Sequence, residues 1–96
     1  MAFIIIIKPD AEDDIQYYRV NEQRIIIDGI KTHFTAEPDT ATKRKKKLRP
    51  NPIAPWELRV DIYRVFYAIH GTTVYVVAIG HKVHNRLYIR GKEVDL

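Results

Sequence analysis

The sequence predicts an α+β fold in which an N-terminal strand and a helical hairpin pack on one face of a small antiparallel β-sheet. Two patterns at the start of the chain support this fold: a short β-branched run in residues 3–7, then apolar residues at helical spacing between residues 10 and 36. From residue 56 onward, an alternating hairpin and a further apolar segment are separated by turn residues, which is typical of antiparallel strands.

The composition is that of an ordinary globular protein. The 96 residues are 46% hydrophobic and 29% charged, which is enough for one modest core, and we expect a single domain spanning residues 1–96. The chain has no cysteine, which excludes disulfides and thiolate metal sites and favours a cytoplasmic location. Its longest apolar run, Met1–Ile7, is too short to span a bilayer, so we expect no membrane association.

The first half of the chain is predicted to form one strand followed by helices. Residues 3–7 are apolar without alternation, so we expect a strand with much of both faces covered. Asp10 is in position to cap a helix whose first turn is acidic. Apolar residues then recur at helical spacing: Ala11, Ile15, Tyr18, Ile25 or Ile26, Gly29 and Phe34. The β-branched run 25–27 and Asn21 disfavour one continuous helix, so we expect two helices separated near Val20-Asn21.

Residues 43–49, which we call the basic strip, concentrate the positive charge of the chain. Six of these seven residues are cationic: Lys43, Arg44, Lys45, Lys46, Lys47 and Arg49. Removing these six charges from the net charge of +4 leaves −2, so the rest of the chain is slightly acidic. Such a run fits contact with a nucleic acid, and it also fits a solvated, flexible loop.

A β-hairpin is predicted after the proline-rich connector of residues 50–55. If Asp61 and Ile62 form a two-residue turn, Arg59 lies directly opposite Arg64. One face of the hairpin is then apolar and packs on the helices: Trp56, Leu58, Val60, Tyr63, Val65, Tyr67 and Ile69. The other face, which the helices leave uncovered, carries Glu57, Arg59, Arg64, Phe66 and Ala68.

The two facing arginines call for an explanation, because like charges directly opposite each other in a sheet repel. Glu57 lies two residues from Arg59 and near Arg64, so the three side chains can form an ordinary surface triad of little energetic value. A single carboxylate offsets two guanidiniums only in part. The face therefore stays positive, and binding of an anion is the second interpretation.

Two segments of the sequence, LRPNPIAPWELRVDIYRVFY and AIGHKVHNRLYIRGKEVDL, resemble the RelE/ParE superfamily of toxins from type II toxin–antitoxin systems. The most specific pieces are the hairpin pattern L-R-V-x-x-Y-R-V-x-Y and the glycine-containing stretch that runs to Tyr88. The resemblance covers essentially the whole chain and implies a RelE-like fold. The sequence departs from the family at the hairpin turn, where Asp61 replaces the usual glycine and Ile62 replaces a polar residue.

The resemblance implies a small toxin that is neutralised by a cognate antitoxin. The ribonuclease branch binds the ribosome and cleaves mRNA without a metal or cofactor, through attack of a 2′-hydroxyl that leaves a 2′,3′-cyclic phosphate. The alternative branch inhibits DNA gyrase and has no catalytic activity, and a diverged, inactive member is a third possibility. The basic residues on the uncovered face favour the ribonuclease.

Carried over by motif, the resemblance implies that Arg64 stabilises the reacting phosphate, with Arg59 and Lys82 as further cations. It puts Tyr88 where the family has a tyrosine that stacks on or orients a base. His81 is a candidate for proton transfer, because an unperturbed imidazole titrates near neutral pH. The candidates for RNA binding are Lys45, Lys46, Lys47, Arg49 and Arg86.

Each of these residues also has a simpler interpretation. Tyr88 fits a half-buried position in a strand, and Lys82 and Arg86 fit solvated positions in a loop. His81 and His84, three residues apart, suggest a metal site, but the chain has no cysteine and no well-placed third ligand. We therefore expect no metal.

Overall fold

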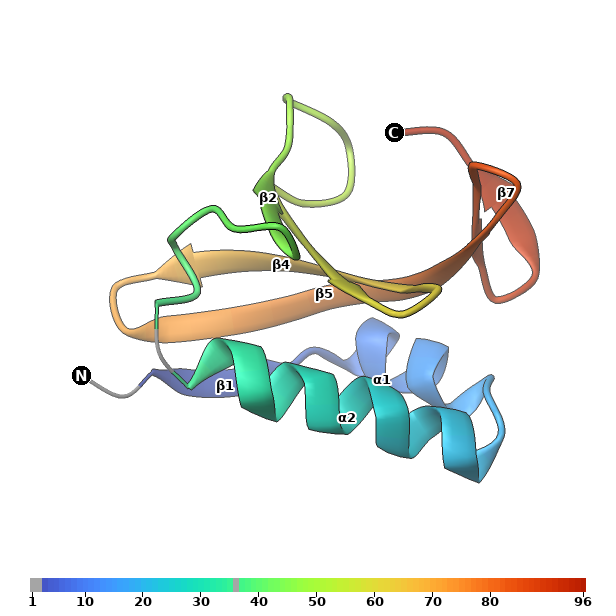
Figure 1. Ribbon diagram of the computed structural model, residues 1–96, viewed down its shortest axis with the longest axis horizontal. Coiled ribbons are helices and arrows are strands. Elements are labelled where there is room, and N and C mark those ends of the chain that lie inside the picture. The colour runs from blue at the N-terminus through green and yellow to red at the C-terminus, as the bar shows by residue number, and fades with distance from the viewer. Residues whose placement is uncertain (1–2, 36) are drawn as a thin grey trace.

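In the computed structural model, which describes residues 3–35 and 37–96, a seven-stranded sheet carries two helices on one face (Figure 1). The elements follow in the order β1 (Ile4–Ile7), α1 (Pro9–Gln16), α2 (Val20–Phe34), β2 (Lys45–Lys47), β3 (Trp56–Val60), β4 (Tyr63–His70), β5 (Thr73–Val83), β6 (Arg86–Ile89) and β7 (Lys92–Val94). The predicted α+β order is confirmed. Met1 and Ala2 of the apolar run, and Ala36 at the end of the predicted helical region, lie outside the described residues.

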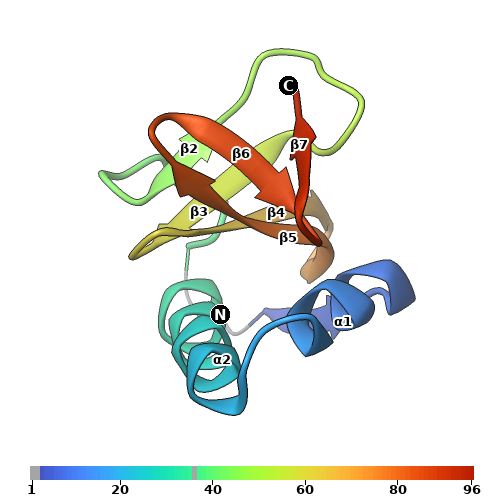
Figure 2. The ribbon, with the colours of Figure 1, turned by 90° about the vertical axis from the view of Figure 1, so that its right-hand side faces the viewer.

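The strands from β2 to β7 lie side by side in chain order, each antiparallel to its neighbours, while β1 pairs in parallel with the first half of β5. Figure 2 shows both helices on one side of the sheet and β6 and β7 rising on the other. The expectation that β1 is covered on both faces is wrong, because Ile4 is 60% exposed and Ile6 is 42% exposed. The helices cover only the face that Ile5 and Ile7 present.

The helices begin earlier than the sequence predicts. Lys8, not Asp10, is the N-cap residue of α1, and it is followed by Pro9, whose missing N–H costs nothing in the first helical turn. Asp10 therefore lies inside that turn, where the positive end of the helix dipole stabilises its negative charge. The helices separate at residues 17–19, two or three residues before the predicted break, and α2 begins at Val20.

The β3–β4 hairpin has the predicted register, with Arg59 opposite Arg64 and Trp56 opposite Tyr67. Its turn is Asp61-Ile62, and Asp61 takes a left-handed φ of 56°, which aspartate tolerates better than most residues. The departure of the turn from the family pattern thus leaves the pairing intact. The side chains of the predicted apolar face pack with α1, α2 and β1 in the main core, where Leu58, Val65 and Tyr67 are fully buried.

Aromatic side chains fill the end of the main core near the end of α2. Phe34 packs on Tyr67 with a ring-centroid distance of 4.3 Å, and Trp56 stacks on the same tyrosine at 5.9 Å. The Tyr67 hydroxyl donates a hydrogen bond to the carbonyl of Pro38, 2.8 Å away, which fixes the chain just beyond α2. Trp56 itself is half-buried, so it closes the rim of this core and does not form its centre.

A second, smaller core lies on the face opposite the helices, and this corrects the expectation that the face is open. Phe66 is fully buried there, together with Ala54 from the connector and Leu87 from β6. Asn51 shapes the connector, because its amide oxygen accepts hydrogen bonds from the N–H groups of Ile53 and Ala54. The connector and the β6–β7 hairpin therefore cover the part of this face that Phe66 occupies.

The carboxylate of Asp14 fills a gap along one edge of β5. That edge pairs with β1 up to Val76 and with β6 from His81 onward, and Asp14 Oδ2 accepts a hydrogen bond from the N–H of Ile79 between them, at 3.0 Å. Its other oxygen lies 2.8 Å from Arg90 Nε. Burial raises the pKa of Asp14 above 3.8, against the opposing effects of the Ile79 hydrogen bond and Arg90. This buried side chain ties α1 to the sheet.

Gly29 provides a test of how α2 packs on β3. A Cβ atom at this position would lie 2.6 Å and 2.7 Å from the two methyl groups of Val60. We expect Gly29→Ala to lower the free energy of unfolding by about 1–2 kcal/mol, because overpacking outweighs the better helix propensity of alanine. In a Val60→Ala background the same change should be neutral or stabilising. Urea denaturation of the four proteins measures this, and a single Gly29→Ala variant more stable than wild type would contradict the packing.

Asp14 predicts a pH dependence of stability. Because the folded state raises its pKa above 3.8, the contribution of this carboxyl to stability is highest below about pH 3.8 and is lost as the pH rises through the raised pKa. Asp14→Asn keeps an acceptor for Ile79 and does not titrate. The stability of this variant relative to wild type should therefore increase as the pH rises from 3.8, as urea denaturation across that range would measure. The exposed neighbour change Asp13→Asn is the control and should show no comparable trend.

Candidate functional site

The two facing arginines of the hairpin have different environments. Arg59, on β3, is exposed, whereas the side chain of Arg64, on β4, is only 12% exposed. Glu57 lies on the same face and is equally covered, and its Oε1 is 3.3 Å from Arg64 Nε. The repulsion between the arginines is therefore relieved by pairing one of them with Glu57 and leaving the other in solvent.

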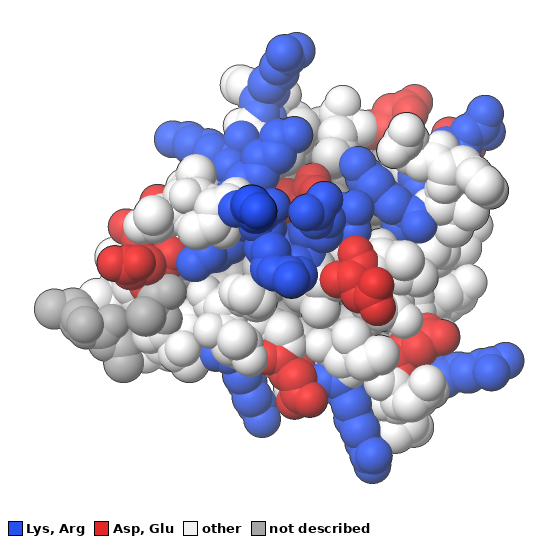
Figure 3. Space-filling model, viewed as in Figure 1, with Lys and Arg blue, Asp and Glu red and all other residues white. Residues whose placement is uncertain are grey.

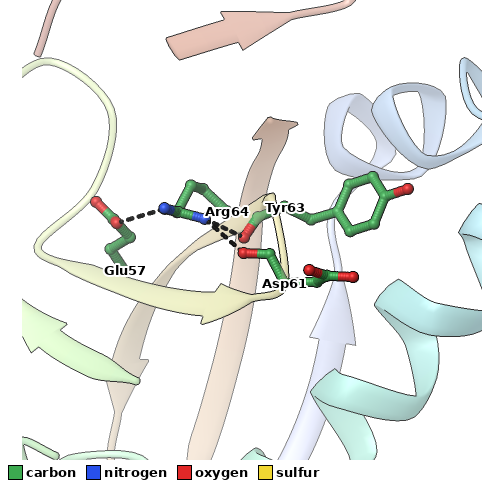
Figure 4. A network of polar contacts seen from close by, with 4 residues as sticks. All are labelled: Glu57, Asp61, Tyr63 and Arg64. Atoms are coloured by element: carbon green, nitrogen blue, oxygen red, sulfur yellow. Dashed lines mark hydrogen bonds and ion pairs between the residues drawn. The ribbon is translucent and has the colours of Figure 1, made fainter. Parts of the chain in front are cut away.

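Arg64 also holds the hairpin turn. Its Nη1 donates hydrogen bonds to the carbonyl oxygens of Asp61 and Tyr63, at 3.1 Å and 3.0 Å. Figure 4 shows the guanidinium between Glu57 on one side and these two carbonyls on the other, while the ring of Tyr63 points away toward the helices. Among the described residues, Nε and Nη1 have protein partners and Nη2 has none.

Burial lowers the pKa of the Arg64 guanidinium from its usual value, and the neighbouring charge of Arg59 acts in the same direction. Glu57 opposes both effects. An arginine starts so far above neutral pH that Arg64 remains a cation in the folded protein. A partly desolvated cation with one free N–H edge is a suitable contact for an anionic oxygen.

A pocket of about 440 Å³, which we call the basic pocket, lies beside this hairpin. Its charged lining comes from the basic strip, β3 and β5: Lys46, Lys47, Arg49, Glu57 and Lys82. Lys46 lies directly opposite Glu57 in the β2–β3 register. Figure 3 shows Lys and Arg side chains gathered over β2 and its surroundings, and four cations to one carboxylate give the pocket a positive potential. The catalytic candidate Lys82 therefore lines the same pocket as three of the RNA-binding candidates, Lys46, Lys47 and Arg49.

Lys45 does not belong to this positive surface, in contrast to the sequence interpretation. The basic strip is not a simple loop, since β2 lies within it, and Lys45 is only 7% exposed. Its Nζ donates to the carbonyl oxygens of His33 and Glu37, at 3.4 Å and 2.9 Å. The ammonium therefore caps the carbonyl end of α2, where the helix dipole favours a cation.

His81 and Tyr88 lie on the opposite face of the sheet from Lys82. His81 pairs with Tyr63 in β4 and with Tyr88 in β6, and its ring stacks on that of Tyr88 with centroids 5.7 Å apart. Its Nδ1 is 2.7 Å from the hydroxyl of Tyr18, a contact that the sequence analysis missed. Because side chains alternate along β5, these two residues do not converge with Arg64 and Lys82. The expected set of five catalytic residues is therefore divided between two faces.

Arg86 lies at the start of β6 and pairs with Val83, so its side chain is on the face of His81 and Tyr88 and not on that of Lys82. It is an exposed side chain whose Nη1 is 3.6 Å from Glu93 Oε1. His84 is exposed in the adjacent turn. In the described part of the chain, His, Asp and Glu side chains form no group of three or more that could hold a metal ion.

Glu57 is the residue whose position the sequence analysis missed. Its charge near the arginines was visible, but its place in a pocket was not, because that pocket depends on the docking of the connector and of β2.

No described helix has the length and apolar character needed to cross a membrane. The arrangement as a whole can bind phosphate groups through lysine and arginine donors, with one carboxylate available to accept a proton.

Comparisons with known proteins show the fold of the chain and do not show its activity. No protein-family model matches the chain, and no curated protein matches it in sequence. The chain is similar to the solved structure of the RelBE2 toxin–antitoxin complex from Mycobacterium tuberculosis, with a TM-score of 0.73 and 19% identity over 85% of this chain and 100% of that one. It is also similar to the RelE–RelB complex from the archaeon Pyrococcus horikoshii, with a TM-score of 0.64 and 17% identity over 82% and 93%. The chain therefore has a RelE-like fold, as the hairpin and the glycine-containing segment predict.

Proposed function

We propose that this chain is the toxin of a type II toxin–antitoxin system and cleaves ribosome-bound mRNA without a metal ion. The observation that carries the proposal is the basic pocket, which is lined by four cations and by Glu57, the partner of Arg64. The RelE-like fold supports it, since similar solved structures include the RelBE2 toxin–antitoxin complex and a RelE–RelB complex.

The proposed reaction needs a proton acceptor for the attacking 2′-hydroxyl and cations where negative charge gathers on the phosphate. Glu57 is our candidate for the acceptor, because it is the carboxylate among the residues that line the basic pocket. Arg64 offers its Nη2 edge to a non-bridging oxygen without giving up its contacts with Glu57 and the turn. Lys46 and Lys82 would hold the phosphates on either side.

The proposed partner of the free toxin is an antitoxin segment that is acidic and disordered on its own. The charge of the basic pocket supports this chemistry, because four cations and one carboxylate leave an excess of positive charge that an acidic peptide would neutralise. Such a segment and mRNA would compete for the same cations, which gives a direct mechanism of inhibition.

RNA binding in the basic pocket should depend on salt in a predictable way. Replacing Lys46 and Lys82 together by alanine should reduce the slope of log affinity against log salt by about 1.4, at about 0.7 per single-strand phosphate. Binding of a fluorescent single-stranded RNA over a salt series measures the slope. Arg24→Ala with Lys31→Ala, exposed cations on α2, is the matched control and should leave the slope unchanged. Equal losses in both double variants would remove the pocket from RNA binding.

Arg64 should matter more for the cleavage rate than for binding to the ribosome. Its contact with the phosphate strengthens as charge develops, so Arg64→Ala should slow mRNA cleavage on programmed ribosomes by on the order of 10²–10³-fold. Arg64→Lys should recover only part of the rate, because an ammonium cannot hold Glu57, the turn and a phosphate oxygen together.

Arg64→Ala also removes contacts within the fold, so its thermal unfolding must be measured beside its activity. Glu57→Gln keeps the shape of the side chain and should lower cleavage while leaving ribosome binding intact. DNA gyrase supercoiling, assayed with the same proteins, tests the alternative branch. A wild-type protein that stalls gyrase and cuts no mRNA would refute the ribonuclease proposal.

A further inference from the structure

Strand β1 lies at an edge of the sheet and, among the described residues, is paired on one side alone. The N–H groups of Ile4 and Lys8 donate to carbonyl oxygens on the β5 side, at 2.8 Å and 3.0 Å. Because main-chain groups alternate along a strand, the N–H and C=O groups of Ile5 and Ile7 point away from β5. The described part of the chain supplies no hydrogen-bond partner for these four groups. They form what we call the free edge of β1.

Nothing within β1 protects this free edge from pairing with another chain. Natural edge strands usually carry a charge, a proline or a bulge for that purpose. All four residues of β1 are isoleucine, and Ile4 and Ile6 are 60% and 42% exposed on the face opposite the helices. Lys8 and Pro9 follow directly, so the free edge can accept a short partner strand but not an extended one.

The charges around β1 disfavour an acidic peptide and are compatible with a second copy of the chain. Asp10 and Glu12 follow β1 at the start of α1, so they repel an acidic segment such as the proposed antitoxin. In an antiparallel pair of β1 strands with its two-fold axis at Ile6, Lys8 lies opposite Ile4 of the other copy. Like charges therefore do not face each other in this pair, and isoleucine meets isoleucine at its centre.

The same register satisfies the free main-chain groups. Ile5 of one copy lies opposite Ile7 of the other, and both residues direct their N–H and C=O groups outward, so the two residues exchange two hydrogen bonds. The two-fold axis produces this pair twice. Ile6 and its counterpart then form a non-hydrogen-bonded pair, in which the Cα atoms lie about 4.5 Å apart.

We propose that the chain forms a homodimer in which two β1 strands pair antiparallel, with the two-fold axis at Ile6. The sheets of the two copies become one continuous sheet. The paired strands are four residues long, so the buried area is small and the Kd is weak, about 10–100 μM. No residue of β1 lines the basic pocket, and the dimer does not require the proposed function.

Disulfide trapping tests the pairing directly, because the chain has no cysteine of its own. Ile6→Cys places each thiol opposite its counterpart, at a Cα separation that a disulfide can bridge. Ile25→Cys, on α2, is the matched control, since Ile25 is 41% exposed and Ile6 is 42% exposed. In a glutathione redox buffer, Ile6→Cys should form the covalent dimer at least about tenfold faster than Ile25→Cys, as non-reducing gel electrophoresis measures.

Ile4→Cys tests the register. In the proposed pair, the two copies of Ile4 lie four positions apart along the ladder, which separates their Cα atoms by about 14 Å. A disulfide cannot bridge that distance, so Ile4→Cys should crosslink as slowly as the Ile25→Cys control. Crosslinking of Ile4→Cys as fast as Ile6→Cys would overturn the proposed register.

Sedimentation equilibrium of the wild-type protein measures the association without a crosslink. Ile6→Lys puts two like charges opposite each other at the axis, so it should raise the Kd at least about tenfold. Ile25→Lys adds the same charge on α2 and should leave the Kd unchanged, and thermal unfolding of both variants checks the fold. A wild-type protein that stays monomeric up to about 1 mM, or a dimer that Ile6→Lys does not weaken, would overturn the proposal.

Discussion

The register of the β3–β4 hairpin is the constraint on which the rest of this structure depends. Its two-residue turn directs Tyr63, Val65 and Tyr67 toward the helices and Arg64 toward the opposite face. A shift of one residue would exchange the two faces, because side chains alternate along a strand. The main core would then lose its aromatic residues, and an arginine would be buried beneath α2. The site and the core therefore come from one register, and neither can change alone.

The same register explains why two arginines face each other without a large energetic penalty. Glu57 pairs with Arg64, and Arg59 extends into solvent, so the two arginines have different environments. This arrangement leaves Glu57 partly covered among lysines that arrive from β2 and β5. In the free protein this carboxylate pairs with Arg64. In the proposed reaction it lies in the same pocket as the cations that bind the phosphate.

The sequence predicts most of the fold because the hairpin and the helices follow local rules. Alternation along the β3–β4 hairpin and the turn at Asp61-Ile62 are visible within fifteen residues, so the register needs no long-range information. The burial of Phe66 and Lys45 was not predictable in this way. Phe66 depends on the docking of the connector and β6, and Lys45 differs from its cationic neighbours only by two carbonyl partners at the end of α2. His81 and Lys82 lie on opposite faces of the sheet because β5 continues to Val83. The sequence did not show where this strand ends.

The division of the expected catalytic residues between two faces changes the chemistry that the site can support. With His81 bonded to Tyr18 and stacked on Tyr88, the histidine stabilises the junction of β5 and β6 with the α1–α2 corner. The basic pocket is then left with cations and one carboxylate, which can bind a phosphodiester, accept a proton and stabilise developing charge. Protonation of the departing 5′-oxygen falls to a lysine of the pocket or to the ribosome. Under the proposed function, cleavage would depend on the ribosome for this step if a ribosomal group, and not a pocket lysine, supplied the proton.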